Sequence, residues 1–117
     1  MDILSCDMLD DQCLPVVYGL TTIRSKERGN KLLVRFAKIF KESYEIRTGK
    51  TPPLVQERAT DIDFADFDDE KLDEALAHFV ALARSFEETG HKSSTEFCQT
   101  IVSLIYNRQY ETGVGHA

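Results

Sequence analysis

Residues 68–90, DDEKLDEALAHFVALARSFEETG, decide the fold class of this chain. Their apolar residues recur at helical spacing, and Gly90 follows at the position where a left-handed C-cap belongs. Acidic residues fill the first two turns, where they complement the positive end of the helix dipole. We therefore predict a helix from about Asp68 to Thr89 with one buried face. The apolar set comprises Leu72, Ala75, Leu76, Phe79, Ala83 and Phe86.

A second helix is predicted earlier in the chain, over residues 25–47. Its apolar stripe has the same spacing, and Gly49 follows it. The Gly29-Asn30 pair is also a turn signal, which would place the start of the helix at Asn30 as an N-cap. The pattern is compatible with both starts. The stripe comprises Leu33, Phe36, Ala37, Phe40 and Tyr44.

The two ends of the chain extend the helical pattern. Ser93-x-x-Glu96 is a capping-box pattern, which predicts a last helix from Ser93 to about Tyr110 and a flexible tail at 111–117. At the other end we expect a short helix and then a second one opened by Pro15, because a strand at 16–20 would have no partner strand. The sequence therefore predicts an all-α bundle of four to six helices in a single domain at 1–110.

Length and composition predict the size and the compartment of this domain. The 117 residues carry a formal charge of -6, with 42% hydrophobic and 29% charged residues, which is ordinary globular usage. The chain has no run of about 20 apolar residues that could span a membrane. Residues 1–11 hold four aspartates and no cation, unlike the positive start of a signal peptide. We expect a cytoplasmic protein.

Metal-binding and catalytic motifs are missing from the sequence. Cys6, Cys13 and Cys98 are an odd number without a C-x-x-C pair, which argues against a disulfide framework and a zinc site. The histidines form no recognisable ligand set, and seven residues across a turn give no reason for His91 to contact Cys98. Phosphate-binding and nucleophile-elbow motifs are also missing. We expect neither enzymatic activity, nor a cofactor, nor a metal.

The segment DIDFADFDDE, residues 61–70, alternates carboxylates with large apolar side chains. An EF-hand loop begun at Asp61 would place Asp66 where the loop needs glycine, so calcium binding is not expected. Phe64 and Phe67, rimmed by aspartates, have the composition of a protein-docking segment; the alternative is that both rings join the core. The candidate partner-binding residues are Asp61, Asp63, Phe64, Asp66 and Phe67.

Positive charge is concentrated between Arg24 and Lys50. This stretch holds nine cations and three anions, a local charge of +6, so the remainder of the chain carries -12. Five of the cations share one face if a single helix runs through Gly29, and such a row could follow phosphates. The alternatives are a solvated helix face or internal pairing with the acidic segment. The candidate nucleic-acid-binding residues are Arg24, Arg28, Lys31, Arg35 and Lys38.

Three stretches together resemble the helical module of bacteriophage replicative-helicase loaders related to replication protein P. They are LVRFAKIFKESY at 33–44, DEKLDEALAHFVAL at 69–82 and SSTEFCQ at 93–99, within a likeness that covers about residues 32–105. The chain departs from that family at Lys92, where a proline would precede Ser93, and it has no tryptophan before the second helix. The resemblance implies an adaptor that docks on a replication protein.

These observations favour a small, non-enzymatic protein-interaction module, an accessory or inhibitory factor of phage or mobile-element origin that docks on a larger protein. One alternative is a nucleic-acid binder that uses the basic row. Another is an acidic DNA mimic, in which the carboxylates of residues 61–74 occupy the phosphate-binding groove of a partner. No membrane partner is expected, and a homodimer is left open.

Overall fold

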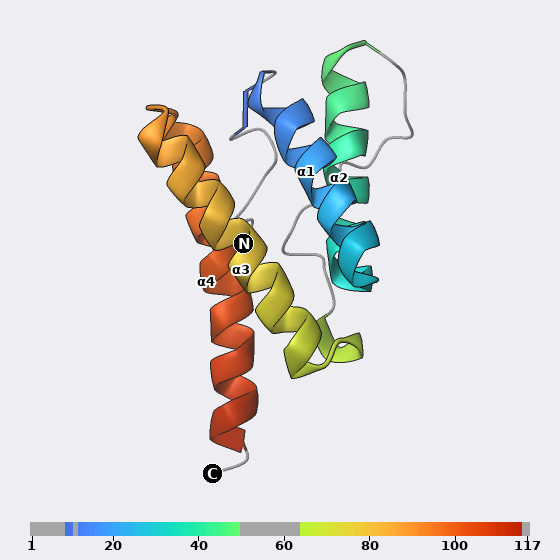
Figure 1. The fold of residues 1–117 in the computed structure, drawn as a ribbon, viewed down its shortest axis with the longest axis vertical. Coiled ribbons are helices and arrows are strands. Elements are labelled where there is room, and N and C mark those ends of the chain that lie inside the picture. Colours follow the sequence, from blue (N-terminus) through green and yellow to red (C-terminus); the bar gives the residue numbers. More distant parts are fainter. Residues whose placement is uncertain (1–8, 11, 50–63, 116–117) are drawn as a thin grey trace.

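The computed structural model describes residues 9–10, 12–49 and 64–115. Within these ranges the chain forms four α-helices and one short 3-10 turn, with no strand, which confirms the all-α prediction (Figure 1). The elements are α1 (Cys13–Arg28), α2 (Lys31–Arg47), η3 (Phe64–Asp66), α3 (Asp69–Glu88) and α4 (Lys92–Gly115). No helix in the described part of the chain is long and apolar enough to cross a membrane.

Helix α1 has Pro15 near its start, as expected for the helix that the sequence opens at Pro15, and the short helix expected before it falls mostly outside the described residues. Pro15 is its third residue, in the first turn, where the missing N–H of proline removes no intrahelical hydrogen bond. Asp10 caps this end, because its Oδ1 accepts the N–H of Gln12 at 3.0 Å and of Cys13 at 2.7 Å. Residues 16–20, which contain β-favouring side chains, are helical throughout.

The helix predicted over 25–47 is broken at Gly29. Gly29 adopts the left-handed conformation, with φ of +60°, and ends α1. Asn30 then starts α2, because its Oδ1 accepts the N–H of Leu32 at 2.9 Å and of Leu33 at 3.1 Å. Of the two starts that the sequence allowed, the structure has the one at Asn30.

Helix α3 lies where it was predicted, and its C-terminal turn determines where α4 starts. Asp68 caps α3 by accepting the N–H of Lys71 at 2.9 Å. After α3, Gly90 has a φ of +82°, and its N–H donates to Glu87 while the N–H of His91 donates to Phe86, which is a Schellman motif.

Helix α4 departs from its prediction at both ends. It begins at Lys92, directly after His91, so Ser93 lies inside its first turn and is not the N-cap that the capping-box pattern predicted. At its other end α4 continues past Tyr110 to Gly115, where a tail was expected.

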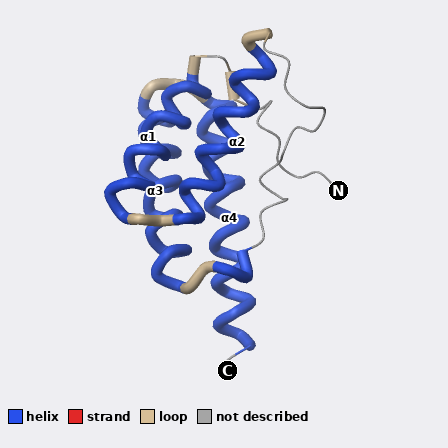
Figure 2. The backbone as a smooth tube through the Cα atoms, turned by 90° about the vertical axis from the view of Figure 1, so that its right-hand side faces the viewer, coloured by secondary structure: helices blue, strands red, loops and turns tan. Residues whose placement is uncertain are grey.

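The four helices form two antiparallel hairpins, α1–α2 and α3–α4, which lie side by side (Figure 1). In the perpendicular view α1 and α3 lie on one side of the molecule, and the last turns of α4 extend beyond the other helices (Figure 2). Four fully buried phenylalanines from three helices fill the space between the hairpins. They are Phe36 and Phe40 of α2, Phe79 of α3 and Phe97 of α4.

A buried asparagine adds a polar connection between the hairpins. Besides capping α2, Asn30 uses its Nδ2 to donate to the main-chain carbonyl of Lys71 at 3.0 Å and to Oε1 of Glu74 at 3.1 Å, both on α3. The Asn30 side chain is completely buried, so it needs these partners in place of water. One amide therefore caps α2 with its oxygen and holds α3 with its nitrogen.

We predict that Asn30→Ala lowers the free energy of unfolding by about 2 to 4 kcal/mol, since it removes a cap and leaves buried acceptors unpaired. Asn30→Asp keeps the capping oxygen but places a carboxylate beside the Lys71 carbonyl and the Glu74 carboxylate, so it should destabilise the protein as much. Urea unfolding followed by circular dichroism measures both, with exposed Asn107→Ala as the control. Wild-type stability of Asn30→Asp would show that only the cap matters.

Candidate interaction surface

Helix α1 has an apolar face that the fold leaves in solvent. Val16, Leu20 and Ile23 follow one another at helical spacing and are 48%, 43% and 56% exposed. The opposite face of α1 carries the buried residues Leu14 and Val17. The helix is thus apolar on two sides, and only one of them is used by the core of this chain. We refer to Val16, Leu20 and Ile23 as the aliphatic ridge.

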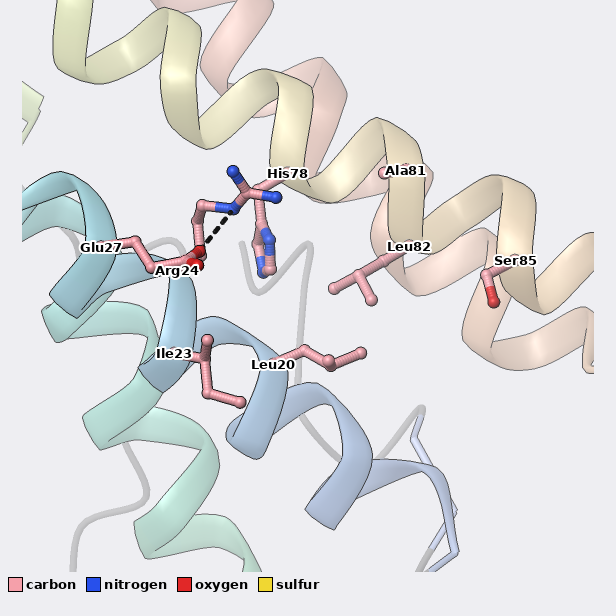
Figure 3. Close-up of a pocket in the computed structure, with 8 residues that line it drawn as sticks. All are labelled: Leu20, Ile23, Arg24, Glu27, His78, Ala81, Leu82 and Ser85. Carbon is pink, nitrogen blue, oxygen red and sulfur yellow. Dashed lines mark ion pairs between the residues drawn. The ribbon is translucent and has the colours of Figure 1, made fainter.

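A hollow of about 270 Å³ lies beside this ridge, between α1 and α3. Figure 3 shows Leu20 and Ile23 extending from α1 toward it and His78 and Leu82 entering it from α3. Ala81 and Ser85 form the rest of the α3 wall, and both are exposed and small. The hollow therefore has a raised aliphatic side on α1 and a low side on α3, where another backbone can approach closely.

His78 forms the polar floor of the hollow. Its Nε2 shares a hydrogen bond of 2.9 Å with Oγ1 of Thr21, a fully buried hydroxyl on α1. Burial, and to a smaller extent the positive charge of Arg24, lowers the pKa of His78 from 6.5 to about 4. The imidazole is thus neutral at pH 7 and links α3 to α1.

Charged side chains border one end of the hollow. Arg24 Nε lies 3.7 Å from Glu27 Oε1 on the same helix, and both side chains are about half exposed (Figure 3). Such an exposed pair contributes less than about 1 kcal/mol, so either partner can exchange it for another charge at little cost.

The basic row predicted from Arg24 to Lys38 is not a single row, because the helix does not run through Gly29. Arg24 and Arg28 lie on α1, whereas Lys31, Arg35 and Lys38 lie on α2, which runs in the opposite direction. The described residues of the row are therefore divided between two antiparallel helices. A groove-tracking row of five cations does not form.

The acidic-aromatic segment meets part of that basic row. Arg35 Nη2 lies 3.7 Å from Asp66 Oδ2, and the Arg35 guanidinium carbon lies 5.4 Å from the centre of the Phe67 ring. These residues, with Lys31 and Lys71, line an open hollow of about 500 Å³. Arg35 of the predicted basic row thus contacts Asp66 and Phe67 of the predicted partner-binding segment, as the internal-pairing alternative expected.

The remaining partner-binding candidates differ in how they are placed. Phe64 and Phe67 are half-buried and pack against the hydrophobic core. They are therefore neither fully exposed, as docking residues would be, nor fully buried, as core residues would be. Asp66 is exposed. Asp61 and Asp63 lie outside the described residues.

Cys98 is completely buried in the core, and burial raises its thiol pKa to about 12. The thiolate that a nucleophile requires is therefore scarce at pH 7. Cys13 is also buried, and the cost of burying its charged form raises its thiol pKa.

Sequence reasoning missed the aliphatic ridge and the His78–Thr21 contact. The ridge residues lie within and just after residues 16–20, whose β-favouring side chains are compatible with either a strand or a helix. A helical projection of residues 13–28 would have shown apolar residues on two faces, although packing against the core requires only one apolar face.

No protein-family model matches the chain, and neither a curated protein nor a solved structure matches it.

We predict that His78 makes the folded state less stable as the pH falls from 6.5 to 4. In this window the unfolded chain binds a proton at His78 and the folded chain does not, so protonation favours unfolding. At 1.36 kcal/mol for each pKa unit, and allowing for partial solvent access, the loss is about 1 to 3 kcal/mol. Unfolding free energies measured at several pH values should fall less steeply for His78→Gln, which does not titrate. Equal slopes for the two proteins would contradict the prediction.

Proposed function

We propose that this protein is a non-enzymatic interaction module that binds one helix of a larger partner protein in the hollow between α1 and α3. The aliphatic ridge carries the proposal. Three large apolar side chains on one face of α1 are exposed to solvent beside a hollow. The other apolar face of α1 is buried in the core. Grouped exposed apolar side chains beside a hollow are typical of protein-binding sites.

The shape of the hollow favours a helix as the bound element. A ridge on α1 and small side chains on α3 reproduce the ridge-and-groove relief into which helices pack, at axis separations of about 8 to 10 Å. An amphipathic helix would place its apolar stripe against Leu20, Ile23 and Leu82. Recognition of this kind needs anchors at i, i+3 or i+4, and i+7 on the partner.

Charge indicates which helix would fit. The second half of α1 carries Arg24, Lys26 and Arg28 against Glu27 alone, so this half of the helix is positive, and Arg24 and Glu27 are the charged residues that line the hollow. A partner helix with carboxylates flanking one end of its apolar stripe would complement it. Arg24 could then exchange its weak contact with Glu27 for a partner carboxylate.

The resemblance to helicase loaders makes a replicative helicase the first partner to test. Docking is proposed on α1 and α3 because the aliphatic ridge is exposed there, whereas Phe64 and Phe67 are half-buried and pack against the hydrophobic core. Nucleic acid is the second candidate partner, because the divided basic row provides no continuous track for phosphates.

We predict that Leu20→Glu and Ile23→Glu each weaken partner binding by about 30-fold or more, the effect of losing a central apolar anchor. Val34→Glu is the matched control, because Val34 is 52% exposed on α2, away from the hollow. The partner is captured from host lysate, identified and purified, and its Kd is then measured for each variant by calorimetry. Equal weakening by Val34→Glu, or none by the two ridge variants, would place the interface elsewhere.

We also predict that the protein does not retard single- or double-stranded DNA in gels at about 50 mM salt, because the net charge is -6 and the basic row is divided. Retardation that disappears in Arg28→Glu and Lys31→Glu would instead support the nucleic-acid-binding alternative.

A further inference from the structure

Three side chains of different chemistry meet where the start of α1 faces the turn between α3 and α4. They are Asp10, Cys13 and His91, and one ligand atom of each lies within 4.8 Å of the others. Their positions in the chain gave no sign of this, because His91 is far in sequence from the other two. The fold brings them together by placing the first hairpin beside the second.

The three groups are all ligands that zinc prefers. Zinc binds thiolate at about 2.3 Å and imidazole nitrogen or carboxylate oxygen at about 2.0 to 2.2 Å. In a tetrahedral arrangement these lengths put the ligand atoms roughly 3.3 to 3.8 Å apart. In the observed grouping the three ligand atoms lie within 4.8 Å of one another, so zinc would need them to move closer by no more than about 1.5 Å.

Hydrogen bonds already hold two of the ligands in position. The Asp10 carboxylate is oriented by the amides of Gln12 and Cys13, and its second oxygen can meet a metal while Oδ1 keeps the cap. Outer-shell hydrogen bonds of this kind orient metal ligands in known sites.

The main chain of His91 is fixed on both sides. Its N–H donates to Phe86 at 2.9 Å, and its carbonyl accepts the N–H of Thr95 at 3.0 Å and the hydroxyl of Thr95 at 2.9 Å. The ring is half-buried and lies edge-on to Phe86, with the ring centres 6.1 Å apart. Cys13 is 4% exposed, which shields its sulfur from solvent.

We propose that Asp10, Cys13 and His91 bind one zinc ion, with a water molecule as the fourth ligand. On binding, the Cys13 thiol releases its proton to solvent and a zinc–sulfur bond forms, while a ring nitrogen of His91 and the Asp10 carboxylate each donate a lone pair. The ion would connect the start of α1 to the turn between α3 and α4, and so link the two hairpins at a second point besides the Asn30 contacts. It acts as a structural link and is independent of partner binding in the α1–α3 hollow.

Metal-free protein titrated with zinc tests this proposal. Calorimetry should show one ion per chain, and the melting temperature should rise with zinc. Cobalt in place of zinc should give a thiolate-to-metal charge-transfer band. Cys13→Ser and His91→Asn should each weaken zinc binding by about 100-fold or more, beyond the loss seen for an outer-shell partner, and Cys13→Ser should abolish the band.

Matched variants separate this site from other thiols and imidazoles. Cys6→Ser, Cys98→Ala and His116→Asn should keep the wild-type affinity and the cobalt band. Circular dichroism without metal shows whether Cys13→Ser and His91→Asn keep the helical fold, so that lost binding is not lost structure. Zinc binding that survives both variants, or that disappears in Cys6→Ser or His116→Asn, would overturn the proposal, as would failure of the folded wild-type protein to bind zinc.

Discussion

The packing of Phe79 against the first hairpin is the contact on which the rest of the structure depends. Its ring lies 4.9 Å from that of Phe36 in an edge-to-face arrangement and 6.2 Å from that of Phe40, which in turn reaches Phe97 of α4 at 5.9 Å. Such pairs add about 0.5 to 1.5 kcal/mol each to the burial of the rings. Because the two helices of each hairpin are in much more extensive contact with each other than with the other hairpin, these rings determine how the two hairpins meet.

That arrangement also creates the candidate interaction surface. With the phenylalanines between the hairpins, α1 and α3 lie beside each other on one side of the molecule, and their polar contact is the neutral pair of Thr21 and His78. A neutral pair can be buried there without the cost of an unpaired charge. The aliphatic ridge then has no neighbour within the described part of the chain to cover it, although the same helix contributes Leu14 and Val17 to the core.

Much of the fold could be predicted, because helical periodicity and glycine positions report local physics. Helix α3 and the αL conformation of Gly90 follow directly from the pattern, and the start of α2 was one of two stated alternatives. The Ser93 pattern misled, because the Schellman motif at Gly90 fixes His91 and starts α4 one residue early. The site was harder to predict, since Thr21–His78 and Asp10–Cys13–His91 join residues whose proximity depends on how the hairpins pack. No local spacing encodes that packing.

The division into two hairpins has a consequence for how the protein opens. Each hairpin closes on itself through a short turn, so its internal contacts are local in sequence, whereas the contacts between hairpins are few and distant. The molecule should therefore contain two cooperative units that can separate transiently before either unfolds. Amides of α1 and α3 that face each other would then exchange with solvent through this partial opening, whereas the buried centres of the hairpins would require complete unfolding. A ligand that binds both units would make them open and unfold together as one cooperative unit.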